Sequence, residues 1–165
     1  NNEISNIFVF TQYKNLNQET SMIGKASFYM KAINSLDGSD VRISKRAQVP
    51  YNRLRGFEKG KIGPVDNTDY IGGNYVTAVN LSTNLPGILS TVENVDFSYF
   101  IDFANVWGVD YDSSINDSNK IRSSTGIGVD FLTPIGPLSF TWADAIKKES
   151  YDQLQKFEFR LGSYF

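Results

Sequence analysis

The sequence contains neither cysteine nor histidine, and these two absences exclude several kinds of chemistry. Without cysteine, the chain has no disulfide, no thiolate nucleophile and no cysteine ligand for zinc. Without histidine, it lacks the commonest metal ligand and the commonest general base at neutral pH. We therefore expect neither an enzyme nor a site for a metal ion or cofactor.

Charge of one sign and long apolar runs are also scarce. The 165 residues include 16 Lys and Arg and 18 Asp and Glu, which gives a net charge of −2. A charge balance this even provides no general attraction for nucleic acid, so we expect no nucleic-acid partner. Apolar runs stay well short of the ~18 residues that indicate a transmembrane helix.

Aromatic residues are abundant instead, at 14% of the chain, and apolar residues recur at every second position. This period of two is typical of β-strands, which place successive side chains on opposite faces. In residues 95–104, for example, apolar residues such as Tyr99 and Ile101 alternate with polar ones such as Asp102. The pattern predicts seven strands, at about residues 3–14, 20–34, 73–84, 92–107, 119–133, 135–146 and 154–165.

The segments between these strands alternate in length. Short connections, such as residues 15–19 and 85–91, are followed by long ones at 35–72 and 108–118. A transmembrane β-barrel alternates in this way, because its periplasmic turns are short and its external loops are long. We therefore predict an all-β fold, a transmembrane antiparallel β-barrel whose apolar strand faces contact lipid and whose polar faces line a wet lumen. The alternative is a soluble β-domain that buries the same apolar faces and binds a ligand among them.

Seven strands are too few for a closed membrane barrel, since single-chain bacterial barrels have an even number of strands from eight upwards. An open sheet of seven strands would also expose two unpaired edges, which lipid does not tolerate. We therefore expect residues 1–165 to be the C-terminal portion of a larger barrel, with a long extracellular loop at 35–72 and the upstream strands outside this sequence.

Four segments carry recognisable motifs: Arg53-Leu54-Arg55-Gly56-Phe57, followed by Lys61-Ile62-Gly63-Pro64 and Gly72-Gly73-Asn74; Phe100-Ile101-Asp102-Phe103-Ala104; Leu132-Thr133-Pro134-Ile135-Gly136-Pro137-Leu138; and Phe157-Glu158-Phe159-Arg160-Leu161-Gly162-Ser163-Tyr164-Phe165. In this order they resemble the sixth extracellular loop, a strand motif, the penultimate hairpin and the terminal strand of BamA-type outer-membrane assembly factors. That family belongs to the bacterial surface antigen superfamily. Two positions depart from its motifs, because Leu54 stands where the family has Val and Ala104 stands where it has Gly.

The resemblance implies a 16-stranded barrel in the bacterial outer membrane, preceded by POTRA domains, of which this chain would supply the last seven strands. It also implies the assembly and insertion of β-barrel proteins through a lateral seam at the C-terminal strand, without a cofactor. The partners would be outer-membrane lipids, client β-barrel polypeptides and accessory lipoproteins of the assembly machinery. Two alternatives are a polypeptide-secreting member of the same superfamily and a passive porin-type channel.

The loop motif is the first candidate site and comprises Leu54, Arg55, Gly56 and Phe57. The resemblance implies that the loop folds back into the lumen and that Arg55 pairs with Asp102. A guanidinium is always charged and binds a carboxylate with two parallel hydrogen bonds, so the chemistry suits this pair. Asp130 is a second candidate partner, because it also belongs to a polar strand face. The plain alternative is a solvated loop arginine.

The C-terminal strand is the second candidate site. Backbone N–H and C=O groups on a free strand edge can pair with an incoming strand, which gives a physical mechanism for inserting a client hairpin. The resemblance therefore implies that this strand is both the seam of the barrel and an assembly signal, whereas the plain alternative is an ordinary edge strand. The candidate residues are Phe157, Phe159, Leu161, Gly162 and Phe165.

Two further stretches predict ordinary structure. Residues 110–117 contain three aspartates but lack the glycine and the terminal glutamate of an EF-hand loop, so they predict a polar external loop. Gly126 and Gly128 lie within a strand that no helix follows, which argues against a dinucleotide site. We expect these glycines to let the strand curve or to make room for the returning loop.

Overall fold

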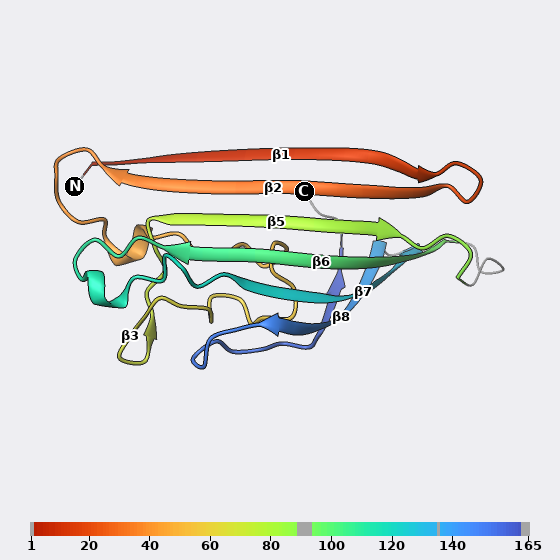
Figure 1. Ribbon diagram of the computed structural model, residues 1–165. Coiled ribbons are helices and arrows are strands. Elements are labelled where there is room, and N and C mark those ends of the chain that lie inside the picture. Colours follow the sequence, from red (N-terminus) through yellow and green to blue (C-terminus); the bar gives the residue numbers. More distant parts are fainter. Residues whose placement is uncertain (1, 89–93, 135, 163–165) are drawn as a thin grey trace.

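The computed structural model describes residues 2–88, 94–134 and 136–162, and its main feature is a curved antiparallel sheet of seven strands (Figure 1). The strands follow one another around the sheet in chain order. They are β1 (Glu3–Asn17), β2 (Met22–Ser35), β5 (Tyr75–Asn84), β6 (Val95–Trp107), β7 (Arg122–Thr133), β8 (Gly136–Lys147) and β9 (Phe157–Leu161). In the described part of the chain, no helix is long or apolar enough to cross a membrane.

All seven predicted strands are present, and the differences lie at their ends and in the long loop. Of the predicted last strand, 154–165, the described residues form β9 from Phe157 on, while Leu154 forms an isolated bridge with Phe57. Phe165 lies outside the described residues. The long loop contains elements that the period of two did not predict: the hairpin of β3 (Val65–Asp66) and β4 (Asp69–Tyr70) and the short 3-10 helix η1 (Ile43–Lys45). A second 3-10 helix, η2 (Ser113–Ile115), lies in the next long loop.

The sheet exposes its apolar face and buries much of its polar face, which is the reverse of a soluble protein. On β6, Asp102 and Phe100 are fully buried, whereas the alternate residues Tyr99 and Phe103 are 41% and 37% exposed. Other large side chains exposed on the same outer face are Val79, Leu81, Ile127, Trp142 and Phe159. A soluble domain would bury these residues, while a membrane barrel turns them to lipid. The soluble alternative is therefore wrong.

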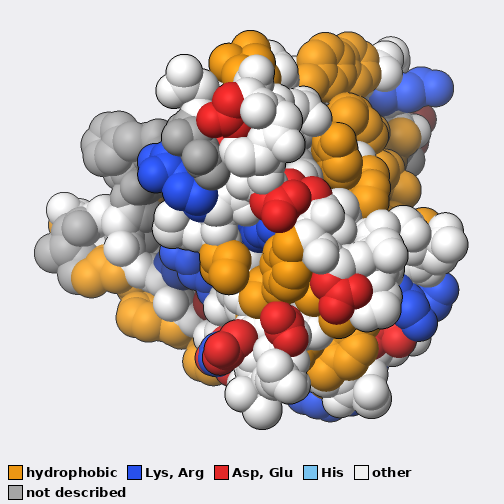
Figure 2. Space-filling model, turned by 90° about the vertical axis from the view of Figure 1, so that its left-hand side faces the viewer, with side chains coloured by type: hydrophobic (Ala, Val, Ile, Leu, Met, Phe, Trp, Pro, Cys, Tyr) orange, Lys and Arg blue, Asp and Glu red, His pale blue; other side chains and the backbone are white. Residues whose placement is uncertain are grey.

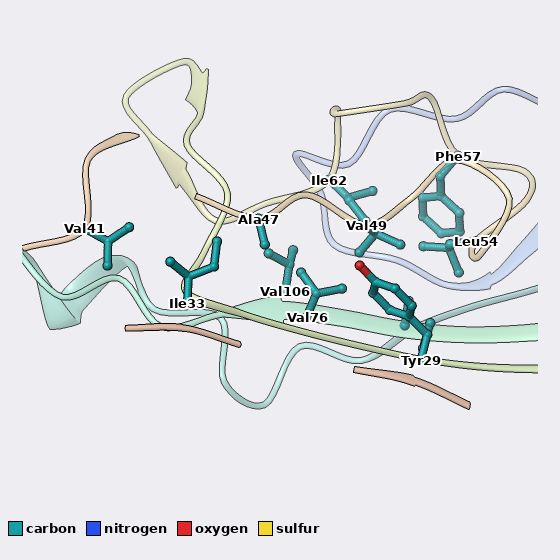
Figure 3. Packing of buried hydrophobic residues seen from close by; sticks show 12 residues of the cluster. Tyr29, Ile33, Val41, Ala47, Val49, Leu54, Phe57, Ile62, Val76 and Val106 are labelled. Carbon is teal, nitrogen blue, oxygen red and sulfur yellow. The ribbon is translucent and has the colours of Figure 1, made fainter. Parts of the chain in front are cut away.

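The inner face, which residues 36–74 cover, holds the main hydrophobic cluster. In Figure 1 this loop lies against the inner side of the sheet, between β5 and β6 on one side and β8 on the other. Figure 3 shows side chains of the loop pointing at side chains of β2, β5 and β6. The cluster comprises Tyr29, Ile33, Val41, Ala47, Val49, Leu54, Phe57, Ile62, Val76, Ala78, Ala104 and Val106. The sequence predicted a wet lumen lined by polar strand faces. Where the loop packs against β2, β5 and β6 this prediction is wrong, because apolar side chains of the loop cover the inner face there.

Gly126 on β7 is required by the packing of the inner face. A Cβ atom at this position would lie 2.7 Å from Cζ of Phe100 and 2.1 Å from the carbonyl oxygen of Trp142. Phe100 is the register partner of Gly126 on the neighbouring strand β6. The missing side chain therefore lets the Phe100 ring lie across β7, which agrees with the expectation that the glycine makes room.

Candidate functional site

Arg55 is anchored on Asp102 in the centre of the inner face. Its Nε and Nη2 atoms donate to Oδ2 and Oδ1 of Asp102, each at 2.8 Å, and its backbone N–H donates to Oδ2 at 3.1 Å. The Asp102 side chain is completely buried, while the Arg55 side chain is 19% exposed. The predicted contact between these two residues is therefore present, and it has the two-pronged geometry that suits a guanidinium and a carboxylate.

Two further residues complete the seat of Arg55. Asn80 on β5 donates one amide hydrogen to Asp102 Oδ1 at 2.8 Å and the other to the Arg53 carbonyl at 2.9 Å. The Phe100 ring lies beneath the guanidinium, with its centroid 3.4 Å from Cζ of Arg55. Sequence reasoning did not name Asn80, and it named Phe100 only as part of a strand motif, not as a residue of the site. The period of two contained the signal for Phe100, because it stands two residues before Asp102 and therefore on the same face.

Asp130 is not a second partner of Arg55. Its carboxylate accepts a hydrogen bond from the Ser139 hydroxyl on β8, and among the described residues it makes no hydrogen bond with Arg55. Both side chains line one polar cavity of about 480 Å³ inside the sheet. The predicted pairing is wrong because the seated loop brings Arg55 to β6, where Asp102 satisfies it, rather than farther along β7.

The glycine of the motif lets the loop turn toward the end of the chain. Gly56 has a φ of +90°, and a Cβ atom there would lie only 3.0 Å from Cβ of Ala143 on β8. Beyond this turn the loop pairs with the segment that leads into β9. Gln155 N–H donates to the Gly56 carbonyl at 3.0 Å, and Glu58 N–H donates to the Gln153 carbonyl at 3.0 Å. The loop motif therefore contacts both β6 and the start of the terminal strand.

The terminal strand β9 pairs with β8 over a short distance. In the residues that the structure describes, its register extends from Phe157 opposite Trp142 to Leu161 opposite Leu138. On the outer face, Phe159 packs on Phe140 with ring centroids 5.2 Å apart, which adds an aromatic contact across the two strands. In the described part of the chain, no strand pairs with the other edge of β9.

The inner face of β9 also contacts the loop. Arg160 pairs with Glu158 at 3.0 Å, and its guanidinium lies 4.9 Å from the ring centroid of Tyr51 in the loop. Gly162, with a φ of +116°, follows the strand and donates its N–H to the Pro137 carbonyl at 3.0 Å. The five predicted residues of this strand therefore divide into Phe157, Phe159 and Leu161 on the outer face, Gly162 after the strand end, and Phe165 outside the described residues.

A buried charge network at the loop end was not predicted. Arg122, at the start of β7, is completely buried and donates to Asp152 from Nε at 2.9 Å and to Asp117 from Nη2 at 2.7 Å. Tyr151 donates its hydroxyl hydrogen to Asp117 at 2.9 Å. Burial, together with the neighbouring Asp117 carboxylate, raises the pKa of the Tyr151 hydroxyl. Part of the predicted polar external loop is therefore an interior ion pair that ties two loops to β7.

Asp110 ties the long loop to the loop after β6. Its carboxylate accepts hydrogen bonds from the Val41 N–H at 2.8 Å and from the Asn74 amide at 2.9 Å, and it pairs with Arg46. Burial alone would raise the pKa of Asp110, but these three donors together hold it below its usual value. Figure 2 looks onto this end of the molecule, where several acidic side chains gather among the loops.

The described residues include no group of three or more Asp, Glu, His or Cys side chains that could hold a metal ion. In this arrangement the charged groups are bonded to one another, Arg55 to Asp102 and Arg122 to Asp117 and Asp152. What it provides is a loop held inside a sheet and a terminal strand with a free edge.

The sequence matches the Omp85 superfamily domain over residues 7–165. It is 31% identical over 140 residues to the outer membrane protein assembly factor BamA of Neisseria meningitidis, which covers 68% of this chain and 17% of that protein. BamA of Neorickettsia risticii is 29% identical over 117 residues, which covers 69% of this chain and 16% of that protein. The crystal structure of BamA from Haemophilus ducreyi lacking POTRA domains 1–3 is similar with a TM-score of 0.85 and 29% identity, over 95% of this chain and 34% of that chain.

The chain thus spans about one sixth of the length of these curated relatives. The domain match nevertheless extends over nearly the whole sequence, and the sheet, with its apolar face turned outward, is similar to the barrel wall of a solved BamA. The predicted barrel architecture and outer-membrane location are therefore confirmed. This chain belongs to the Omp85 superfamily, and it is a BamA-type β-barrel segment of the bacterial outer membrane.

Proposed function

We propose that this chain takes part in the assembly and insertion of β-barrel proteins into the outer membrane, with β9 as a lateral seam. The observation that carries the proposal is the weak attachment of β9. Among the described residues it pairs with β8 over the five residues Phe157–Leu161, whereas β7 pairs with β8 from Ser123 to Thr133. The two curated relatives are named as assembly factors, which supports the same activity.

The free edge of β9 supplies the driving force. Unpaired N–H and C=O groups are costly in lipid, so this edge must pair with another strand. We propose that a strand outside these 165 residues closes the barrel against β9 at rest, and that a client hairpin replaces it during insertion. Because one set of backbone hydrogen bonds replaces another, the exchange needs no nucleotide and no covalent step.

The seated loop determines where β9 begins. Arg55 fixes the loop to β6, and the pairing of residues 56–58 with residues 153–155 fixes the chain that enters β9. Movement at the seam is therefore confined to the strand itself while β8 stays in place. In this proposal, the partners are client β-barrel polypeptides, membrane lipids and accessory lipoproteins.

The same loop makes a passive channel a poor alternative. Its apolar side chains fill the space inside the sheet at the level of Val49, Leu54 and Phe57. A porin-type pore requires a polar, water-filled interior along its whole length. Polypeptide secretion through the lumen would require the loop to leave this seat, and the experiment below separates it from insertion.

The test is to close the seam covalently in the intact protein. Cysteines replace Leu161 and a facing residue of the first barrel strand, and a bifunctional maleimide joins them. We expect the insertion of client barrels into vesicles to stop, because β9 can no longer exchange partners. The matched control joins Leu138→Cys to Leu161→Cys, register partners on β8 and β9, and should remain active. Full insertion activity with a closed seam contradicts the proposal, and continued secretion of a polypeptide favours the alternative.

A further inference from the structure

A trough follows β2 on the outer, lipid-facing side of the sheet. Two cross-strand rows form it, one through Gly24 and one through Ala26, and both residues are small. Larger side chains stand on the strands at either side, with Leu16 on β1 and Leu81 on β5. The trough has a volume of about 550 Å³, which lies within the ~300–1,000 Å³ of ordinary small-molecule sites.

The composition of the trough changes along its length. The row through Ala26 begins at Gln12 on β1 and continues into Leu81 and Ile101, so this part is apolar from β2 to β6. The row through Gly24 ends on Lys14 of β1, and this row lies nearer the short turn between β1 and β2. Short turns lie on the periplasmic side of such barrels, where the membrane surface and its headgroups begin. The trough therefore has an apolar interior and a positive charge at the membrane surface.

We propose that this trough binds one phospholipid of the periplasmic leaflet. An acyl chain lies over Gly24 and Ala26, and the phosphate contacts the ammonium group of Lys14. A lysine on a lipid-facing strand places its stem along apolar surface and its charge at the headgroups, which suits this contact. Because all these residues face lipid rather than the lumen, the site is separate from the loop seat and from the seam.

The first test fills the trough in the intact protein. Ala26→Trp places a ring where the acyl chain lies, and the matched control Ala32→Trp places the same ring on the same face of β2 outside the trough. Native mass spectrometry in detergent, with added dioleoylphosphatidylglycerol, measures the bound lipid. We expect Ala26→Trp to weaken binding roughly tenfold or more, since losing about two buried methylene groups accounts for a factor of ten. The control should bind as the unaltered protein does.

The second test separates the headgroup from the acyl chain. Lys14→Gln should weaken phosphatidylglycerol binding by about two- to fivefold, the range that an exposed ion pair provides, and leave dioleoylglycerol binding unchanged. Heat-modifiable electrophoretic mobility establishes that each variant is folded, and Ala26→Leu provides a milder filling variant if the tryptophan prevents folding. The proposal is overturned if a folded filling variant binds lipid as the unaltered protein does, or if Ala32→Trp loses as much lipid as Ala26→Trp.

Discussion

Replacing Asp102 with alanine should release the loop from its seat. The Asp102 carboxylate accepts three hydrogen bonds from Arg55 and one from Asn80, and it is completely buried. In a loop that stays seated without it, the guanidinium keeps its charge and its contact with the Phe100 ring but loses its counter-charge. Asn80 keeps one partner, because its amide still donates to the Arg53 carbonyl.

The expected effect follows from the exposure of the two partners. Removing one member of a buried ion pair costs about 3–5 kcal/mol, because the other charge is left uncompensated. The Arg55 side chain is 19% exposed, so water from the adjacent polar cavity can solvate part of it. We therefore expect Asp102→Ala to destabilise the seated loop by about 3 kcal/mol, the lower end of this range. A free-energy change of this size lowers the ratio of seated to released loop on the order of a hundredfold.

Tryptic cleavage of the loop in the intact protein, inserted in vesicles, measures this ratio. Arg53, Lys59 and Lys61 all lie in the seated segment, and cleavage follows the population of the released state when release is fast. Asp96→Ala is the matched control, since Asp96 is an exposed carboxylate on the same strand and the same face. A surface change of this kind is expected to alter stability by no more than about 0.5 kcal/mol.

A double-mutant cycle tests the pairing itself. If Asp102 acts through Arg55, adding Arg55→Ala to Asp102→Ala should bring little further cleavage, because the unpaired charge has been removed as well. The reasoning is refuted if Asp102→Ala is cleaved no faster than Asp96→Ala, or if the two changes at Arg55 and Asp102 are simply additive.

Two further predictions concern the loop end of the barrel. Arg122→Ala should lower the urea midpoint of unfolding by an amount equivalent to about 3–5 kcal/mol, because Asp117 and Asp152 lose their shared counter-charge; an unchanged midpoint contradicts the reading of these residues as one network. Asp110 has a lowered pKa in the folded protein, so its stabilising effect is complete above about pH 4, the ordinary Asp value, and is lost as the pH falls through the folded value. Protease protection of residues 36–48 should therefore decrease below about pH 4, and Asp110→Asn should remove that dependence on pH.

The strands could be predicted from the sequence because exposure to lipid or to the lumen alternates with every residue. Tyr99 and Asp102 lie on opposite faces for that reason alone, and the seven strands and their order follow from repeating the pattern. The start of β9 could not be predicted, because residues 154–156 have the same alternation as a strand. They pair with the loop and with Ala143 instead, through contacts made by chain segments far apart in sequence.

The partners of the charged residues were decided by the tertiary structure. Sequence resemblance named Asp102 for Arg55, but Asp130 was an equally acidic residue on a polar face, and only the path of the loop separates the two. Arg122 gave no signal, since its partners Asp117 and Asp152 lie in two different loops and Asp152 is 30 residues away in the chain. A buried charge must be paired, and its partner is the opposite charge that the fold places next to it. That placement depends on the tertiary structure rather than on the local sequence pattern.

By itself, then, the sequence determined an all-β sheet whose strands have one apolar and one polar face, since a period of two is a local property of the chain. The alternation of short and long connections favoured a membrane barrel, and the exposure of the apolar face in the structure decided that this face points outward. The tertiary structure alone decided that the long loop fills the inside of the sheet with an apolar cluster and that it holds the start of β9. The physical reason is that a loop of this length has many conformations in isolation, and only the strands around it provide the buried surface and the paired charges that select one of them.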